Sequence, residues 1–182
     1  MHRDYFKTPH PIPNVAYSDV LNLLERGKVR EAEVLAGELK GEEREKALAL
    51  VYLQQGRVNR ALDMLLRLYY TKGHRDDVAR MVAHAFIRRL DFATAKDFLE
   101  KIREKTVDDY FWLFISALFL GDPTSARTYL HYAREKDPKR AAELTREAYK
   151  LIVLPARNLT DNQKMELLKR IESYFKEGGA NL

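Results

Sequence analysis

Four stretches of the chain repeat one design, and this repetition constrains the fold more than any other feature. Each stretch has an apolar helical segment, a short break, and a second helical segment whose polar opening residues precede an alanine. Helices commonly end at a residue with positive φ, which glycine adopts easily, and alanine lets two helices approach closely. Stacked antiparallel helix pairs are therefore predicted. The breaks are Gly27, Gly56, Leu90 and Gly121, and the alanines are Ala32, Ala61, Ala95 and Ala126.

The spacing of further packing residues around these breaks resembles the tetratricopeptide repeat family, over roughly Asn14 to Pro138. The resemblance implies an all-α fold, a right-handed superhelix of stacked antiparallel hairpins in which the first helix of each pair lines a concave groove. Leu90 departs from the pattern, because glycine is expected at that break. The residues that carry the resemblance are Leu48, Ala49, Tyr52, Gly56, Ala61 and Leu68 in the second repeat; Ala83, Phe86, Ala95 and Leu99 in the third; and Leu113, Gly121, Ala126, Ala133 and Pro138 in the fourth.

Three regions follow from this pattern: an extended N-terminal segment over 1–13, four repeats over 14–138, and two C-terminal capping helices over 139–182. The first capping helix is predicted from Lys139 to about Leu154, because a proline follows at position 155. The second is predicted to begin after an N-cap at Thr160 and to stop at Gly178 and Gly179. Its apolar stripe consists of Met165, Leu168, Ile171 and Phe175, widened by Leu167 and Tyr174.

The fourth repeat opens with ten residues, Phe111 to Leu120 (FWLFISALFL), that carry no charge. A helix of this length spans roughly 15 Å, about half of the hydrocarbon core of a bilayer, so it is too short to cross one. A helix that is apolar on all sides is buried on all sides. Three coverings are open: the last helix of the chain, a second copy of it, or a helix or peptide of another protein.

The resemblance assigns a set of first-helix positions to the groove. The implied groove is apolar at both ends and basic in the middle, and it would dock a protein segment. In some tetratricopeptide domains Lys, Asn and Arg residues hold a terminal carboxylate; Leu50 stands here where that Asn is expected, which favours a more apolar ligand. The groove positions are Tyr17, Leu21 and Leu24; Lys46, Leu50, Leu53 and Gln54; Arg80, His84, Ile87 and Arg88; and Phe111, Ile115, Leu118 and Phe119.

Composition bounds the remaining possibilities. Basic and acidic residues number 32 and 27, and they alternate along the chain as on a solvated helix surface, although the net charge of +5 leaves nucleic-acid binding as an alternative. The chain has no cysteine, which excludes disulfides and cysteine-based metal sites. Its N-terminus lacks a signal-peptide pattern, so a cytoplasmic location is expected. The abundance of Lys, Arg and Glu fits a thermophilic source.

Catalytic and metal-binding patterns are weak. No two of the five histidines show the spacing of a helical zinc site, and no nucleophile, base and orienting acid come together. Arg80, His84 and Arg88 share one helical face and could bind a carboxylate or phosphate. The alternative is that His84 packs while the arginines pair with nearby acids. The acidic pairs Asp76–Asp77 and Asp108–Asp109 precede helices, where carboxylates complement the helix dipole.

The sequence thus predicts a non-enzymatic protein-interaction module or adaptor, without metal or cofactor, that docks an apolar or amphipathic peptide or helix. The docked segment could be its own C-terminal helix or a second copy of the chain. A nucleic-acid-binding helical repeat and a homodimeric structural scaffold are the alternatives.

Overall fold

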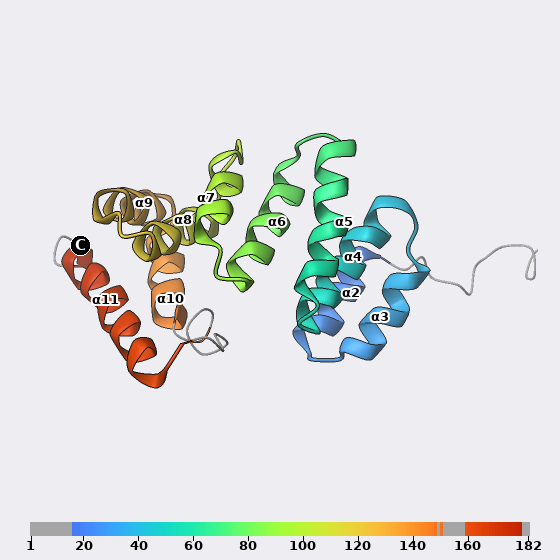
Figure 1. The fold of residues 1–182 in the computed structure, drawn as a ribbon, viewed down its shortest axis with the longest axis horizontal. Coiled ribbons are helices and arrows are strands. Elements are labelled where there is room, and N and C mark those ends of the chain that lie inside the picture. The colour runs from blue at the N-terminus through green and yellow to red at the C-terminus, as the bar shows by residue number, and fades with distance from the viewer. Residues whose placement is uncertain (1–15, 149, 151–158, 180–182) are drawn as a thin grey trace, which may run out of the picture. The chain divides into compact units, whose positions relative to one another are not determined.

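The computed structural model describes residues 16–148, 150 and 159–179, and within these ranges the chain forms ten α-helices and no strand (Figure 1). The predicted all-α class is confirmed. The N-terminal segment over 1–13 and the predicted end of the first capping helix lie outside the described residues, and the handedness of the superhelix stays a prediction. The helices are α2 (Tyr17–Glu25), α3 (Val29–Glu38), α4 (Gly41–Gln54), α5 (Val58–Thr71), α6 (Asp76–Arg88), α7 (Phe92–Glu100), α8 (Val107–Phe119), α9 (Pro123–Lys136), α10 (Pro138–Ala148) and α11 (Asp161–Gly179).

The helices form consecutive pairs in two compact units, Met1–Thr71 and Lys72–Leu182. In unit 1, α4 packs against α2, α3 and α5. In unit 2, α8 packs against α7, α9 and α10, and α10 in turn packs against α9 and α11. The first helices α4 and α8 therefore contact both their own partners and a helix of a neighbouring pair, as expected for stacked hairpins.

The four breaks share one backbone geometry. Gly27, Gly56, Leu90 and Gly121 have φ values of 73°, 80°, 60° and 74°. In each turn the following residue donates its N–H to a carbonyl five residues back, as Lys28 does to Leu23 at 2.9 Å and Asp91 to Phe86 at 2.9 Å. This is the Schellman arrangement that closes a helix C-terminus. Leu90 adopts it despite its side chain, at a cost of about 1–2 kcal/mol for a left-handed residue that is not glycine.

The predicted close approach of paired helices is present at the four alanines. Ala32, Ala61, Ala95 and Ala126 are fully buried, each near the start of the second helix of its pair. No side chain beyond a methyl group is needed to fill the space, and a larger one would push the two helices apart.

The apolar run predicted to be buried is covered from Phe111 to Leu118, whereas Phe119 is half-buried and Leu120 is 46% exposed. Every residue from Phe111 to Leu118 is buried, Trp112 being 8% exposed and most of the others fully covered. The hydroxyl within the run belongs to Ser116, and it donates to the carbonyl of Trp112 at 2.8 Å. The polar group therefore has a partner inside the apolar helix.

Helix α11 begins where the sequence indicates and turns part of its predicted stripe inward. The N–H of Gln163 bonds to the Thr160 hydroxyl at 3.2 Å, and the Gln163 side chain accepts the N–H of Thr160 at 2.9 Å, which confirms the predicted cap. Ile171 and Leu167 are buried, whereas Met165 is 50% exposed. The prediction of Met165 as a stripe residue is wrong, because the buried positions are spaced four residues apart from Leu167 and place Met165 on the opposite side of the helix.

Candidate protein-docking surface on the first helices

The first helix of each pair carries the residues that the sequence assigns to a groove. These are α2 and α4 in unit 1 and α6 and α8 in unit 2. We call the predicted groove residues of α2 and α4 the unit 1 surface, and those of α6 and α8 the unit 2 surface. The two differ in how much side chain they leave accessible.

The unit 1 surface keeps apolar side chains partly accessible. Tyr17, Leu21 and Leu24 on α2 and Leu50 on α4 are half-buried, while Leu53 is buried and Gln54 is exposed. Lys46 places its Nζ 5.1 Å from the centroid of the Tyr17 ring, so a cation–π contact joins α2 to α4. This surface offers a row of leucines next to one cation.

The unit 2 surface is dominated by an ion pair that joins its two first helices. Arg80 on α6 donates from Nε to Oδ1 of Asp109 at 2.8 Å and from Nη2 to Oδ2 at 2.7 Å. Asp109 on α8 is fully buried. A two-pronged contact of this kind is the strongest form of arginine–carboxylate pairing. It also neutralises the charge that the sequence assigned to the middle of the groove.

Asp109 is held from its own helix as well. The N–H of Thr106 donates to Oδ2 of Asp109 at 2.9 Å, and the N–H of Asp109 donates to the Thr106 hydroxyl at 3.2 Å, which makes a capping box at the start of α8. Burial alone would raise the pKa of Asp109, but the hydrogen bonds from Arg80 and Thr106 outweigh it and lower that pKa below its usual range. The predicted role of this acid at the helix N-terminus is therefore one part of what it does.

His84 lies one turn beyond Arg80 and packs against a residue that the sequence analysis missed. Its ring meets the Trp112 ring edge-on, with the centroids 5.2 Å apart. Burial lowers the pKa of His84, so the ring is neutral at pH 7. With Arg80 paired and His84 neutral, the prediction of a basic centre is wrong for these two residues; Arg88 is exposed. The alternative, a packing histidine beside an arginine paired with an acid, describes them.

The lowered pKa of His84 predicts a pH dependence. The unfolded chain binds a proton near the ordinary histidine pKa of about 6.5, whereas the folded chain binds it only at lower pH. Stability is therefore expected to be fully present above about pH 6.5 and to fall as the pH drops towards the folded pKa. Urea midpoints at several pH values should show this slope in the wild type and a flatter one in His84→Gln. Equal slopes in the two proteins would contradict a histidine ring that stays neutral in the folded chain.

A second ion pair continues the connection to α10. Arg140 donates from Nε and Nη2 to the two carboxylate oxygens of Asp108 at 3.0 and 2.9 Å. Adjacent acids at the start of α8 thus bind arginines of two different helices, Asp109 that of α6 and Asp108 that of α10. Asp76 at the start of α6 accepts the N–H groups of Arg103 and Glu104, which lower its pKa. These acids connect helices in addition to complementing helix dipoles.

The predicted groove residues of α8 have little surface to offer. Phe111 and Ile115 are fully covered and Leu118 is 1% exposed, while half-buried Phe119 stacks on Phe92 of α7 with the ring centroids 4.0 Å apart. Ile87 on α6 is 6% exposed. A partner could reach these side chains only if the neighbouring helices of unit 2 moved away. The accessible part of the predicted groove therefore lies on α2, α4 and the exposed end of α6.

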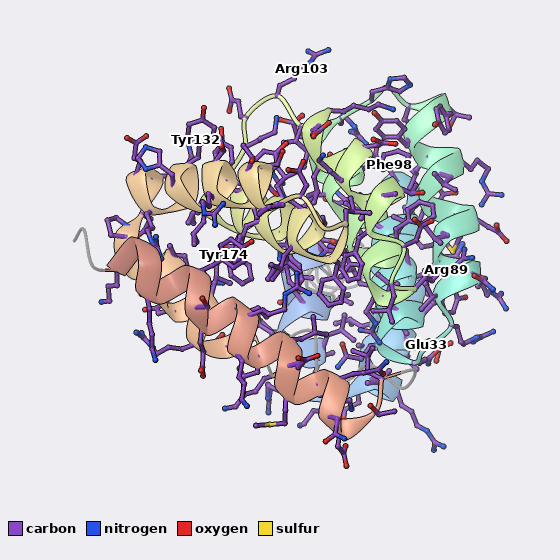
Figure 2. All side chains as sticks on the ribbon, turned by 60° about the vertical axis from the view of Figure 1, so that its left-hand side comes forward. Glu33, Arg89, Phe98, Arg103, Tyr132 and Tyr174 are labelled. Carbon is purple, nitrogen blue, oxygen red and sulfur yellow. The ribbon has the colours of Figure 1, made fainter. Side chains whose placement is uncertain are left out.

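Helix α11 covers part of unit 2 from the C-terminal end. Tyr174 meets Phe114 of α8 with the ring centroids 5.7 Å apart, and the guanidinium of Arg127 on α9 lies 5.5 Å from the Tyr174 ring (Figure 2). Figure 2 shows Tyr174 in the space between α11 and α9. A segment of this same chain thus contributes to covering α8, which is one of the three coverings that the sequence left open.

The contacts between successive first helices have a sequence signal that is visible only in retrospect. Tyr17 and Lys46, and likewise Arg80 and Asp109, are separated by 29 positions, and His84 and Trp112 by a similar interval. One repeat length therefore brings a residue next to its neighbour on the following first helix. Opposite charges or aromatic–cation pairs at that interval could have identified these partners.

Neither a metal-binding cluster nor a membrane-spanning helix occurs among the described residues. Among them, no group of three His, Asp or Glu side chains is placed to hold a metal ion. No helix in the described part of the chain has both the length and the apolar character to cross a membrane.

Comparisons with solved structures place this fold. The chain superimposes on "MamA AMB-1" with a TM-score of 0.61 at 16% identity, over 89% of this chain and 94% of that one. It superimposes on "MamA MSR-1" with a TM-score of 0.57 at 17% identity, over 89% and 96%. MamA is a TPR-like protein, so the resemblance to tetratricopeptide repeats is confirmed at the level of the fold. No family model and no curated protein matches the sequence.

Proposed function

We propose that the chain is a protein-interaction module that docks an apolar or amphipathic segment of another protein on its first helices. The observation that carries this proposal is the unit 1 surface, where Leu21, Leu24 and Leu50 stay half-exposed beside Lys46 on a TPR-like fold. Partly exposed leucines on rigid helices suit the apolar face of a partner helix.

The structure gives less support to the other readings. A nucleic-acid interface needs arginines that are available to phosphates, and the arginine nearest the centre of the predicted surface, Arg80, is bound to Asp109. An enzyme needs a nucleophile, base and orienting group within reach of one another, and the polar residues of the unit 2 surface instead hold helices together. We therefore propose a non-enzymatic role.

Site-specific photocrosslinking tests the proposal in the native host. A benzophenone amino acid is placed at position 50, on α4, or at position 34, where Val34 of α3 is 70% exposed. Position 50 is expected to capture a discrete protein and position 34 to capture none, because only the first is on the proposed surface. Equal capture at both positions, or none at either, would contradict docking on this surface.

Affinity measurements with the captured segment then test individual contacts. Leu50→Asp should weaken binding roughly 10- to 100-fold, since burial of one leucine in an interface is worth about 1.5–3 kcal/mol. Val34→Asp is the matched control, a similar change on the surface of α3, and it should leave the affinity within about twofold. Circular dichroism of both variants checks that the fold is retained.

A further inference from the structure

An apolar pocket lies at the end of unit 2 where α6 turns into α7, and it shares only Phe119 with the unit 2 surface. Its volume is about 350 Å³. It is formed by the α6–α7 turn, the start of α7, the end of α8 and the residue before the α11 cap. The apolar lining consists of Leu90, Phe92, Ala93, Phe119, Leu120 and Leu159. The stacked rings of Phe92 and Phe119 form part of the wall.

Leu90 contributes to this pocket at a conformational cost. The other three breaks place glycine at the same left-handed position, and a Cβ added to any of those glycines would meet no atom within 4 Å. Space is therefore not what distinguishes the four turns; the backbone conformation disfavours any side chain there. A strained residue that persists is a reason to look for function. The side chain that breaks the pattern lines the pocket.

The pocket has one exposed apolar lining residue, and two exposed cations directly precede another lining residue in the chain. Leu120 is 46% exposed. Arg88 and Arg89, directly before Leu90, are exposed and make no ion pair with any residue that the structure describes. The acid in the lining, Asp91, has Oδ1 engaged by the N–H of Thr94 at 3.2 Å, where it caps α7. Asp122, two residues after Leu120, likewise accepts the N–H of Ser125 at 3.1 Å, where it caps α9. The acids that follow Leu90 and Leu120 are thus engaged at helix starts, whereas the two arginines are not engaged in ion pairs with described residues.

We propose that this pocket takes a leucine-sized or phenylalanine-sized side chain of a partner peptide whose neighbouring residues are acidic. The proposal rests on the proposed function and adds a second contact point with a stated chemistry. A cavity of about 150 Å³ holds a benzene molecule, so 350 Å³ accommodates one large apolar side chain. The arginines are not part of the lining and directly precede Leu90 in the chain, so residues adjacent to the anchor along a peptide chain would reach them and a free apolar molecule would not.

Methyl NMR of the full chain tests the pocket directly. The probes are two synthetic peptides, acetyl-Ser-Glu-Glu-Leu-Glu-Glu-Ser-amide and the same peptide with lysine in place of each glutamate. The acidic peptide should shift the methyl signals of Leu90, Leu120 and Leu159 in a saturable way, with at least tenfold tighter binding than the basic peptide. No shift at millimolar acidic peptide, or equal binding of the two, overturns the proposal.

Two variants separate a binding role from a structural one. Leu90→Gly relieves the left-handed strain, so its urea midpoint should stay equal to or above that of the wild type while binding of the acidic peptide falls at least fivefold. A lowered midpoint with unchanged binding would show that Leu90 only closes the core. The double change Arg88→Glu and Arg89→Glu should reverse the preference in favour of the basic peptide. An unchanged preference would contradict the proposal that these two arginines select acidic residues.

The same titration distinguishes failure of the pocket from failure of the proposed function. If the acidic peptide shifts Leu21 and Leu50 but leaves Leu90 and Leu120 unchanged, docking on the first helices stands and the pocket proposal is overturned. Sedimentation of the free chain tests whether a second copy of the chain occupies the pocket. A dimer that dissociates in the Leu90→Gly variant would show such an occupant and would also overturn the proposal.

Discussion

Replacing Arg80 with alanine is expected to lower the free energy of unfolding by about 3 kcal/mol. The change leaves the carboxylate of Asp109 buried without its main partner, and breaking a buried pair on one side typically costs about 3–5 kcal/mol. The lower end applies because Thr106 still donates to this carboxylate. Urea unfolding followed by fluorescence measures the effect, since the single tryptophan, Trp112, lies in unit 2 against His84.

The pair of Arg140 with Asp108 is the matched control. Its two hydrogen bonds have similar lengths, but the side chains are 37% and 39% exposed, compared with 29% and 0% for Arg80 and Asp109. Arg140→Ala should therefore cost only about 0–1 kcal/mol, as for other solvent-accessible pairs. If the two alanine variants lose the same stability, burial of Asp109 is not what makes its pair important.

In the acidic range, the pH dependence of the free energy of unfolding should reverse its direction in the Arg80→Ala variant. In the wild type, the lowered pKa of Asp109 contributes stability that is present above the ordinary aspartate pKa of about 3.9 and is lost as the pH falls through the folded value. Without Arg80, burial becomes the main influence and raises that pKa. The variant should then lose stability as the pH rises above about 3.9, which urea midpoints between pH 4 and 6 would reveal.

The helix pairs could be predicted from the sequence because their signals are local. A turn needs a residue that accepts positive φ within a few positions of the apolar segment it ends, and a close helix pair needs a small residue near its start. The pattern was strong enough to place the break at Leu90, which has the required φ of 60° without being glycine. The buried run on α8 was predictable for a similar reason, because it is apolar on every side.

The contacts between pairs could not be predicted in the same way. Which residue of α8 meets Arg80 depends on how far α8 is rotated and shifted relative to α6, and the periodicity of each helix does not determine that. The repeat pattern grouped Arg80 with Phe111, whereas the structure pairs it with Asp109 and covers Phe111 completely. The predicted groove therefore lacks the positive charge expected from Arg80, because this arginine is paired with an acid of the same unit.

The same limitation explains why Met165 on α11 was misplaced. Leucine, isoleucine, methionine and aromatic residues occur at enough positions of that helix to support more than one stripe. The structure buries Leu167 and Ile171 and brings Tyr174 against Phe114, because α11 packs against α10 and the α8–α9 pair. These three residues belong to the predicted stripe, whereas Met165 is 50% exposed.

Replacing Ile171 with aspartate is expected to detach α11 from unit 2. Ile171 is fully buried and Leu167 is 9% exposed, and burial of two such side chains contributes about 3–6 kcal/mol. An uncompensated carboxylate at the centre of this contact removes that contribution and adds a desolvation cost. Removal of residues 160–182 should have the same consequence. Both proteins should bind an environment-sensitive apolar dye and sediment as larger species, because the surface around Phe114 becomes accessible.

Met165→Asp provides the control for this result, since it introduces the same charge on the same helix at a residue that is 50% exposed. Its urea midpoint and dye binding should match the wild type, with a stability change within about 0.5 kcal/mol. If Ile171→Asp behaves like Met165→Asp, α11 contributes little to covering unit 2. If the truncated chain exposes the dye-binding surface yet stays monomeric, the surface that α11 covers does not drive self-association, and a homodimeric scaffold loses its most direct route to assembly.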